Sequence, residues 1–271
     1  CRPRGSGLMP LEMQRLATRR GIECDLLTAG DGPDLVFFHG AGGASPDDPL
    51  LAALAQIFRV HAPVWPGFGT DETETAIEDM LDFTLHGWDL IDALKLARPP
   101  LIVGHSMGAM IAAEMASVAR HDLQQLVLLT PAGMWIDAEP TPDLFAMLPF
   151  EMAQTLFHDP VQGEKLMTGG LDFNDNDALT AFMVGNARRL GTAGKILFPI
   201  PNRRLSKRIH RIGVPTLVVG GASDGLVPPS YIELWGESIA NCSVVMIAEA
   251  GHMVHVEQPQ VVADAIVSFA T

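Results

Sequence analysis

The fold is decided by one stretch of the sequence, Leu101-Ile102-Val103-Gly104-His105-Ser106-Met107-Gly108. Its apolar start predicts a buried strand, and the apolar residues 109–116 after it predict a helix. A serine at the turn between them needs a strained backbone, and Gly104 and Gly108 lack the Cβ atoms that would collide with it. The stretch therefore predicts a strand, a tight turn and a helix, with the Ser106 hydroxyl exposed at the mouth of a parallel sheet. A turn that only packs the helix close to the strand is the alternative.

Composition limits the class of protein. The 271 residues are 48% hydrophobic and 18% charged, which suits one large α/β domain with a sizeable core. The net charge of −14 argues against a nucleic-acid partner, and no apolar run reaches the roughly 20 residues of a membrane-spanning helix. Three cysteines without a C-x-x-C pair do not make a disulfide framework, and a cytoplasmic location is expected.

Alternating strands and helices predict the architecture. Apolar runs between turn signals predict strands before and after the central one, at 21–27, 34–38, 59–62, 123–130, 214–220 and 243–247. Helical patterns lie between them, at 49–58, 75–97, 109–116, 230–239 and 258–269. We therefore expect an α/β fold with a mostly parallel central sheet flanked by helices. Residues 1–20 are expected to be a leader or a disordered N-terminus.

The alternation stops between residues 134 and 210. No strand is predicted there, and helices are expected at 141–157 and 177–190. This segment holds five of the 13 methionines and six of the 12 phenylalanines, which suit an adaptable apolar pocket. Alternatively, these side chains only attach an inserted helical layer to the core of the protein. We predict a helical cap at 134–210 inserted into a core of residues 21–133 and 211–271.

Three side chains stand just beyond the carboxyl ends of apolar strands, where open α/β sheets bind ligands: Ser106, Asp224 and His252. A serine hydroxyl needs a base, a histidine can accept its proton, and a carboxylate fixes the histidine tautomer. Alternatively, the acid is Asp137 after the preceding strand, Asp224 is a turn residue before Gly225, or His252 only caps its loop.

A glycine-rich loop, His39-Gly40-Ala41-Gly42-Gly43, follows the strand at 34–38. Its amides could form half of an oxyanion hole, with the Met107 amide as the other half; a plain surface turn is the alternative. His39 is expected to shape this loop by hydrogen bonding. His105 is likewise expected to pack or to form a hydrogen bond. His255 is a neighbour of His252 in the sequence, but its pattern places it less clearly on the loop.

Two neighbouring arginines stand in the second predicted helix of the cap, Arg188 and Arg189. They would either orient a substrate carboxylate or lie on a solvent-exposed helix face. Most arginines in proteins are exposed, which favours the second alternative.

These motifs resemble cap-containing members of the α/β-hydrolase superfamily. The matching stretches run in the right order from residue 21 to the C-terminus: 39–43, Pro66-Gly67-Phe68-Gly69, 104–108, 221–228 and 250–259. The resemblance implies Ser106 as nucleophile, Asp224 as acid and His252 as base. It also implies the N–H groups of Ala41, Gly42 and Met107 as the oxyanion hole. Haloalkane dehalogenases and epoxide hydrolases of this fold carry Asp as the nucleophile, so Ser106 argues against both activities.

The expected function is therefore a serine hydrolase that cleaves an ester, thioester or lactone in a small apolar substrate, through an acyl-enzyme and without a cofactor or metal. One alternative is a C–C bond hydrolase of the meta-cleavage product type, because residues 201–217 are similar to that group. A non-enzymatic ligand receptor on the same fold is an alternative of another class. The sequence is compatible with a homo-oligomer.

Overall fold

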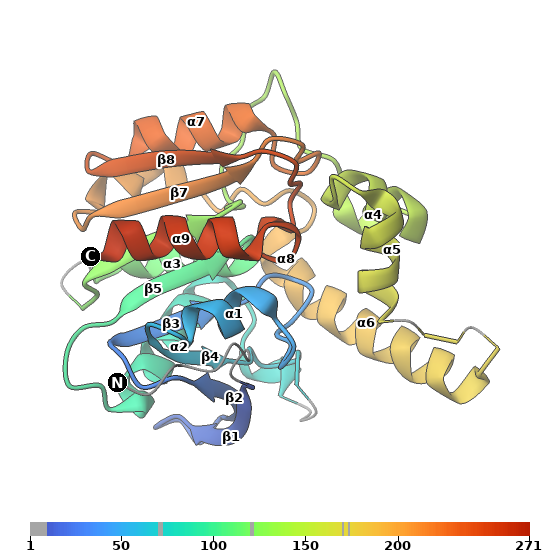
Figure 1. Cartoon of the computed structure of the whole chain (residues 1–271), viewed down its shortest axis with the longest axis horizontal. Coiled ribbons are helices and arrows are strands. Elements are labelled where there is room, and N and C mark those ends of the chain that lie inside the picture. Colours follow the sequence, from blue (N-terminus) through green and yellow to red (C-terminus); the bar gives the residue numbers. More distant parts are fainter. Residues whose placement is uncertain (1–9, 70–72, 120–121, 170, 173) are drawn as a thin grey trace, which may run out of the picture.

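The computed structural model describes residues 10–69, 73–119, 122–169, 171–172 and 174–271. Its centre is one eight-stranded sheet with the order β1-β2-β4-β3-β5-β6-β7-β8 (Figure 1). The strands are β1 (Glu12–Ala17), β2 (Glu23–Ala29), β3 (Asp34–Phe38), β4 (Arg59–Pro63), β5 (Leu101–His105), β6 (Gln125–Leu129), β7 (Thr216–Gly221) and β8 (Cys242–Ile247). All pairs are parallel except β1–β2 and β2–β4. The expected fold class is confirmed.

Helices cover both faces of the sheet (Figure 1). Apolar side chains of α2, α3 and α7 pack on one face, and those of α1 and α9 pack on the other. Because both faces are covered, every residue of β5 is buried, which explains the apolar side chains from Leu101 to Val103. The core helices are α1 (Pro49–Leu54), the 3-10 helix η1 (Glu74–Ala76), α2 (Met80–Leu94), α3 (Met107–Val118), α7 (Pro229–Ser238), α8 (Val254–Glu257) and α9 (Pro259–Ala270).

The expected leader at residues 1–20 is wrong for residues 12–17, which form β1. This strand pairs with β2 from Glu12 opposite Thr28 to Ala17 opposite Glu23. Its side chains are mostly exposed at the edge of the sheet, so no apolar run marks it in the sequence. Residues 1–9 of the expected leader lie outside the described residues.

The segment between β6 and β7 is helical, and we call residues 134–210 the insert. Its described residues contain no strand, as predicted, and its helices α4, α5 and α6 lie to the right of the sheet in Figure 1. They are η2 (Leu144–Ala146), α4 (Pro149–Leu156), α5 (Pro160–Thr168), α6 (Asn176–Leu197), η3 (Leu205–Lys207) and η4 (Ile209–Arg211). One helix at 141–157 is wrong, because extended backbone at Met147 and Leu148 separates η2 from α4. Helix α5 was not predicted.

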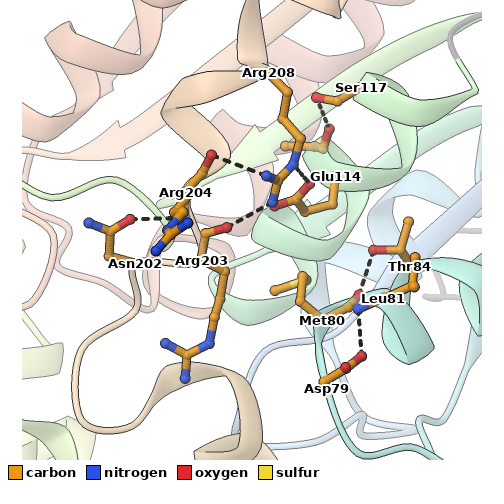
Figure 2. Close-up of polar contacts among 11 residues, drawn as sticks. Asp79, Met80, Leu81, Thr84, Glu114, Ser117, Asn202, Arg203, Arg204 and Arg208 are labelled. Atoms are coloured by element: carbon orange, nitrogen blue, oxygen red, sulfur yellow. Dashed lines mark hydrogen bonds and ion pairs between the residues drawn. The ribbon is translucent and has the colours of Figure 1, made fainter.

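The end of the insert is tied to α3 by an ion pair. Arg208, between η3 and η4, donates from Nε to Oε2 of the buried Glu114 at 2.6 Å, and from Nη2 to its Oε1 (Figure 2). The same guanidinium donates to the carbonyl oxygens of Arg203 and Arg204 at 2.8 and 3.2 Å. The insert therefore returns to the sheet through a fixed contact with α3.

None of the helices in the described part of the chain is both long and apolar enough to cross a membrane.

Candidate active site

Ser106 stands at the turn between β5 and α3. Its backbone has φ 52° and ψ −112°, a conformation that L-residues rarely adopt. A Cβ atom on Gly104 would lie 2.6 Å from Ala109 Cα, and one on Gly108 would lie 2.1 Å from Phe38 O. Both positions therefore require glycine, as the sequence predicts, and the strained serine is held in place by packed backbone.

The structure brings Ser106, His252 and Asp224 together in one chain of hydrogen bonds. The Ser106 Oγ lies 2.8 Å from His252 Nε2, and His252 Nδ1 lies 2.9 Å from Asp224 Oδ2. A carboxylate only accepts, so Nδ1 carries the proton that is donated to Asp224, and Nε2 is free to accept from the Ser106 hydroxyl. All three side chains are buried, although they come from the ends of three different strands.

The two candidate acids have different surroundings. Asp224 is buried, and its Oδ1 accepts hydrogen bonds from Leu226 N and Val227 N at 2.8 Å each. These bonds fix the carboxylate so that the remaining oxygen faces His252. Asp137 is exposed and accepts a hydrogen bond from Trp135 Nε1 at 3.0 Å. The structure therefore brings Asp224, and not Asp137, to the histidine.

Two buried side chains donate hydrogen bonds to the backbone carbonyl of His252. The His252 carbonyl accepts from His105 Nε2 at 3.0 Å and from Thr130 Oγ1 at 2.9 Å. His105 therefore hydrogen-bonds, as expected, and burial lowers its pKa well below the usual value. Thr130 was not predicted. It follows β6 with φ 42°, an unusual value for a β-branched residue, and nothing in the sequence distinguishes it from an ordinary strand end.

His255 is a buried neighbour without a contact to Ser106 or Asp224 in the described hydrogen bonds. Its ring packs on His105 at a centroid distance of 4.1 Å, and its Nε2 lies 3.9 Å from Asp48 Oδ2. Burial lowers the pKa of His255 to about 3, so its ring is neutral at pH 7. His252 is therefore the histidine placed to exchange a proton with Ser106.

The glycine-rich loop after β3 lies against the turn at Ser106. A Cβ atom on Gly40 would lie 2.7 Å from His105 Nδ1, so the loop backbone approaches as only glycine allows. His39 shapes the loop as expected: its Nδ1 donates to Gly40 O at 2.7 Å, and its Nε2 accepts from Trp65 N at 3.1 Å. Burial lowers the pKa of His39 to about 4, which keeps the ring neutral.

The amides of the expected oxyanion hole lie around the serine. Ala41 and Gly42 line the same cavity as Ser106 and His252. Met107 is the first residue of α3, and the first N–H groups of a helix have no partner within it. The oxyanion hole stays a prediction, and the positive end of the helix dipole next to Ser106 would favour an anion there.

Ser106 lies between two cavities of different character. One is a small recess of about 50 Å³, lined mainly by apolar side chains that include Leu144, Phe145, Leu197 and Tyr231. The other is an open cleft of about 1210 Å³ between the sheet edge and the insert, with both apolar and charged walls. Ser106 therefore lines two cavities that differ in size and polarity.

The two arginines of α6 differ. Arg188 Nη2 donates to Glu74 Oε2 at 3.0 Å. Arg189 lines the open cleft and lies close to the glycine-rich loop, with its Cδ 3.4 Å from where a Cβ atom on Gly43 would stand. No hydrogen bond or ion pair joins Arg189 to another described residue, and partial burial lowers its pKa. Arg189 is thus a cation that faces the cavity of Ser106.

No group of three or more His, Cys, Asp or Glu side chains in the described part of the chain is arranged to hold a metal ion.

Comparison with known proteins identifies the family. The sequence pattern of the alpha/beta hydrolase family matches residues 35–265. This chain belongs to the alpha/beta hydrolase family. The match covers the sheet from β3 onward and the whole insert. Relatives of this hydrolase include proteins named hydrolase, esterase and lipase. The chain is therefore a hydrolytic enzyme.

Several relatives of this hydrolase have names that specify a reaction. It is 24% identical to a 2-hydroxy-6-oxo-6-(2'-aminophenyl)hexa-2,4-dienoic acid hydrolase of Metapseudomonas resinovorans, over 95% of this chain and 90% of the relative. It is 25% identical to a pimeloyl-[acyl-carrier protein] methyl ester esterase of Pectobacterium carotovorum subsp. carotovorum, over 90% of this chain and 96% of the relative.

Solved structures share the fold of the hydrolase. A membrane phospholipase A described as a bacterial virulence factor has a TM-score of 0.79 at 22% identity, over 96% of this chain and 86% of that one. The 2-hydroxy-6-oxo-6-phenylhexa-2,4-dienoate hydrolase of Rhodococcus sp. strain RHA1 has a TM-score of 0.78 at 19% identity, over 96% and 99%. At these identities the likeness extends to the fold alone.

Proposed function

We propose that this hydrolase cleaves an ester, thioester or lactone of a small apolar substrate through an acyl-enzyme on Ser106. The observation that carries the proposal is the buried chain of hydrogen bonds from Ser106 Oγ through His252 to Asp224, which lies between two cavities. Relatives named as esterases and lipases support this class of substrate.

In this mechanism, His252 Nε2 takes the proton of the Ser106 hydroxyl as Oγ attacks the carbonyl carbon of the substrate. Negative charge develops on the carbonyl oxygen, where the N–H groups of Ala41 and Met107, with Gly42, stabilise it. His252 then gives its proton to the leaving oxygen or sulfur, and the acyl group remains on Ser106. Asp224 keeps the histidine in the productive tautomer and stabilises the imidazolium.

A water molecule completes the cycle by the same route. His252 removes its proton as the water oxygen attacks the acyl carbon, and the proton then returns to Ser106 Oγ as the acid leaves. The insert would act as the cap of this site. Its Leu144, Phe145 and Leu197 line the small recess, which supports a preference for an apolar group on that side of the scissile bond.

A second candidate is hydrolysis of a C–C bond in an acidic substrate of the meta-cleavage product type. The observation that favours it is Arg189, a cation in the cleft that contains Ser106, with no ion-pair partner among the described residues. Such a group would bind a substrate carboxylate. A relative named as a dienoic acid hydrolase supports the same class.

One experiment separates these functions. The purified protein is treated with a fluorophosphonate probe and then assayed on p-nitrophenyl esters of increasing chain length beside a vinylogous 1,5-diketone carboxylate. We expect labelling that Ser106→Ala abolishes, and ester turnover above diketone turnover. Faster diketone turnover, with a KM that Arg189→Gln raises at least tenfold, would favour the second candidate. A folded protein that neither labels nor turns over either substrate would support a ligand receptor.

A further inference from the structure

The C-terminal end of α4 is hydrogen-bonded to the loops that carry Asp224 and His252. Gly225, directly after Asp224, donates its N–H to Thr155 O at 3.1 Å. Met253, directly after His252, donates its N–H to Leu156 O at 3.1 Å. Two successive carbonyl groups of the insert therefore hold the residues that follow the proposed acid and the proposed base.

The packing at this junction leaves no room for side chains. A Cβ atom on Gly251 would lie 2.6 Å from Leu156 O, and one on Gly225 would lie 2.9 Å from Thr155 O. A displacement of the α4 end would therefore move both loops, because backbone contacts backbone there.

One carboxylate, that of Glu257, joins the same parts a second time. At the end of α8, its Oε2 accepts from Gly251 N, next to His252, at 2.7 Å. Its Oε1 accepts from His158 N at 2.7 Å and from Asp159 N at 3.4 Å, in the corner between α4 and α5. Hydrogen bonds to an ionised acceptor are about twice as strong as neutral ones. The charge of Glu257 thus stabilises the His252 loop and the insert in one arrangement.

We propose that Glu257 is a positioning residue, which makes the α4–α5 corner part of the frame that aligns His252 with Ser106. The inference rests on the proposed function, in which His252 is the base for Ser106. A displacement of reacting groups by about 1 Å can cost about a hundredfold in rate, so the loss of these hydrogen bonds would lower turnover through the position of His252. Glu257 also lines the open cleft, as Glu249 does. The insert then has two roles: it encloses the cavities and it positions the base.

The test is Glu257→Gln, compared with the matched control Glu249→Gln. The amide keeps the size of the side chain, but its NH₂ group replaces one acceptor oxygen and would face either Gly251 N or the N–H groups of His158 and Asp159. Glu249 is exposed on the same loop, lines the same open cleft as Glu257, and has no side-chain hydrogen bond within the described part of the chain. Both changes remove one negative charge from the cleft that contains His252. A purely electrostatic effect would therefore alter the pH profile of both variants alike.

We expect Glu257→Gln to lower kcat and the rate of fluorophosphonate labelling by roughly 10- to 100-fold, with KM within about threefold of wild type. Amide hydrogen exchange should become faster in residues 250–253 and in 155–159 together. Glu249→Gln should behave as wild type in all three measurements. Glu257→Asp keeps the charge, but its shorter side chain reaches only one of the partners. Its kcat and labelling rate should therefore lie between those of Glu257→Gln and Glu249→Gln. If Glu257→Gln does not fold, Glu257→Asp is tested by the same criteria.

The inference is overturned if Glu257→Gln labels and turns over at the rate of Glu249→Gln. It is also overturned if activity falls while exchange in both segments stays unchanged. Wild-type protein that does not label, or a Ser106→Ala variant that still turns over, would instead overturn the proposed function. The two failures are therefore distinguishable.

Discussion

The sheet edge and the insert contribute to the same cavity in different ways. At the sheet edge, backbone packs on backbone: a Cβ atom on Gly221 would lie 2.1 Å from Gly251 O, and one on Gly108 is equally impossible. In the insert, Gly191 has no atom within 4 Å of an added Cβ, and Phe150 and Met183 are largely exposed. The difference teaches that the proposed reacting groups stand on a frame with no freedom to adjust, whereas exposed positions of the insert away from the α4 end can change their side chains at little structural cost.

The largest expected effect is loss of the proposed nucleophile, Ser106, at the rigid edge. Ser106→Ala should fold as the wild type does and should lower kcat by about a million-fold, because no other side chain is hydrogen-bonded to His252 Nε2 in the described structure. Steady-state kinetics on an activated ester, with circular dichroism as the check on folding, measures this. Ordinary activity in a well-folded variant would place the reaction elsewhere.

The next effect compares two carboxylates, one at the edge and one at the start of the insert. Asp224→Asn should lower kcat by roughly 10³- to 10⁴-fold with little change in KM, since an amide can hold His252 in the wrong tautomer. Asp137→Asn should change kcat by less than about tenfold, because that side chain is exposed and bonded to Trp135. Kinetics of both variants on one ester decides the matter, and a reversed ranking would move the acid to the insert.

A pair of glycines tests the contrast in stability rather than in rate. Gly108→Ala should destabilise the protein by about 3 kcal/mol or more, because its Cβ would meet the Phe38 carbonyl. Gly191→Ala, in the exposed part of α6, should stabilise it by up to about 1 kcal/mol through helix propensity. Urea unfolding of both variants gives the two values. Equal effects would show that the edge is no more rigid than the insert.

A smaller effect concerns acid stability in the core. His86 on α2 is buried without a hydrogen-bond partner among the described residues, and burial lowers its pKa to about 4. Since the unfolded value is 6.5, the unfolded chain binds more protons between pH 6.5 and 4, and stability falls as pH falls through that window.

His86→Leu removes this contribution. Between pH 7 and pH 5 the variant should lose less unfolding free energy than wild type, by up to about 2 kcal/mol. Burial raises the pKa of Asp48 to about 6, so this group adds stability as pH falls. Asp48 is present in both proteins, and its contribution cancels in the comparison. Parallel pH dependences in the two proteins would rule out His86 as the source.

The sequence predicted what depends on buried strands and on glycine. Ser106, Asp224 and His252 follow apolar strands, and parallel pairing then brings the ends of those strands to one edge. Strand β1 was missed because an exposed edge strand needs no apolar pattern. Thr130 and the contacts of Glu257 were missed because they depend on which loops meet in space, and no local pattern encodes that. The proposed limits of the cap, 134 and 210, stay a prediction.

The strand order has a consequence for the nascent chain. From β5 onward the strands join the sheet in the order in which they are synthesised, β5, β6, β7 and β8. The insert emerges after β6, so Thr155 and Leu156 are made about 70 and 97 residues before Gly225 and Met253, to which they bond. Until β7 is made, the edge of β6 has no partner, and α4 lacks its contacts until the Asp224 and His252 loops follow. A ribosome stalled within the insert would therefore carry a chain that lacks Asp224 and His252 and exposes the edge of β6.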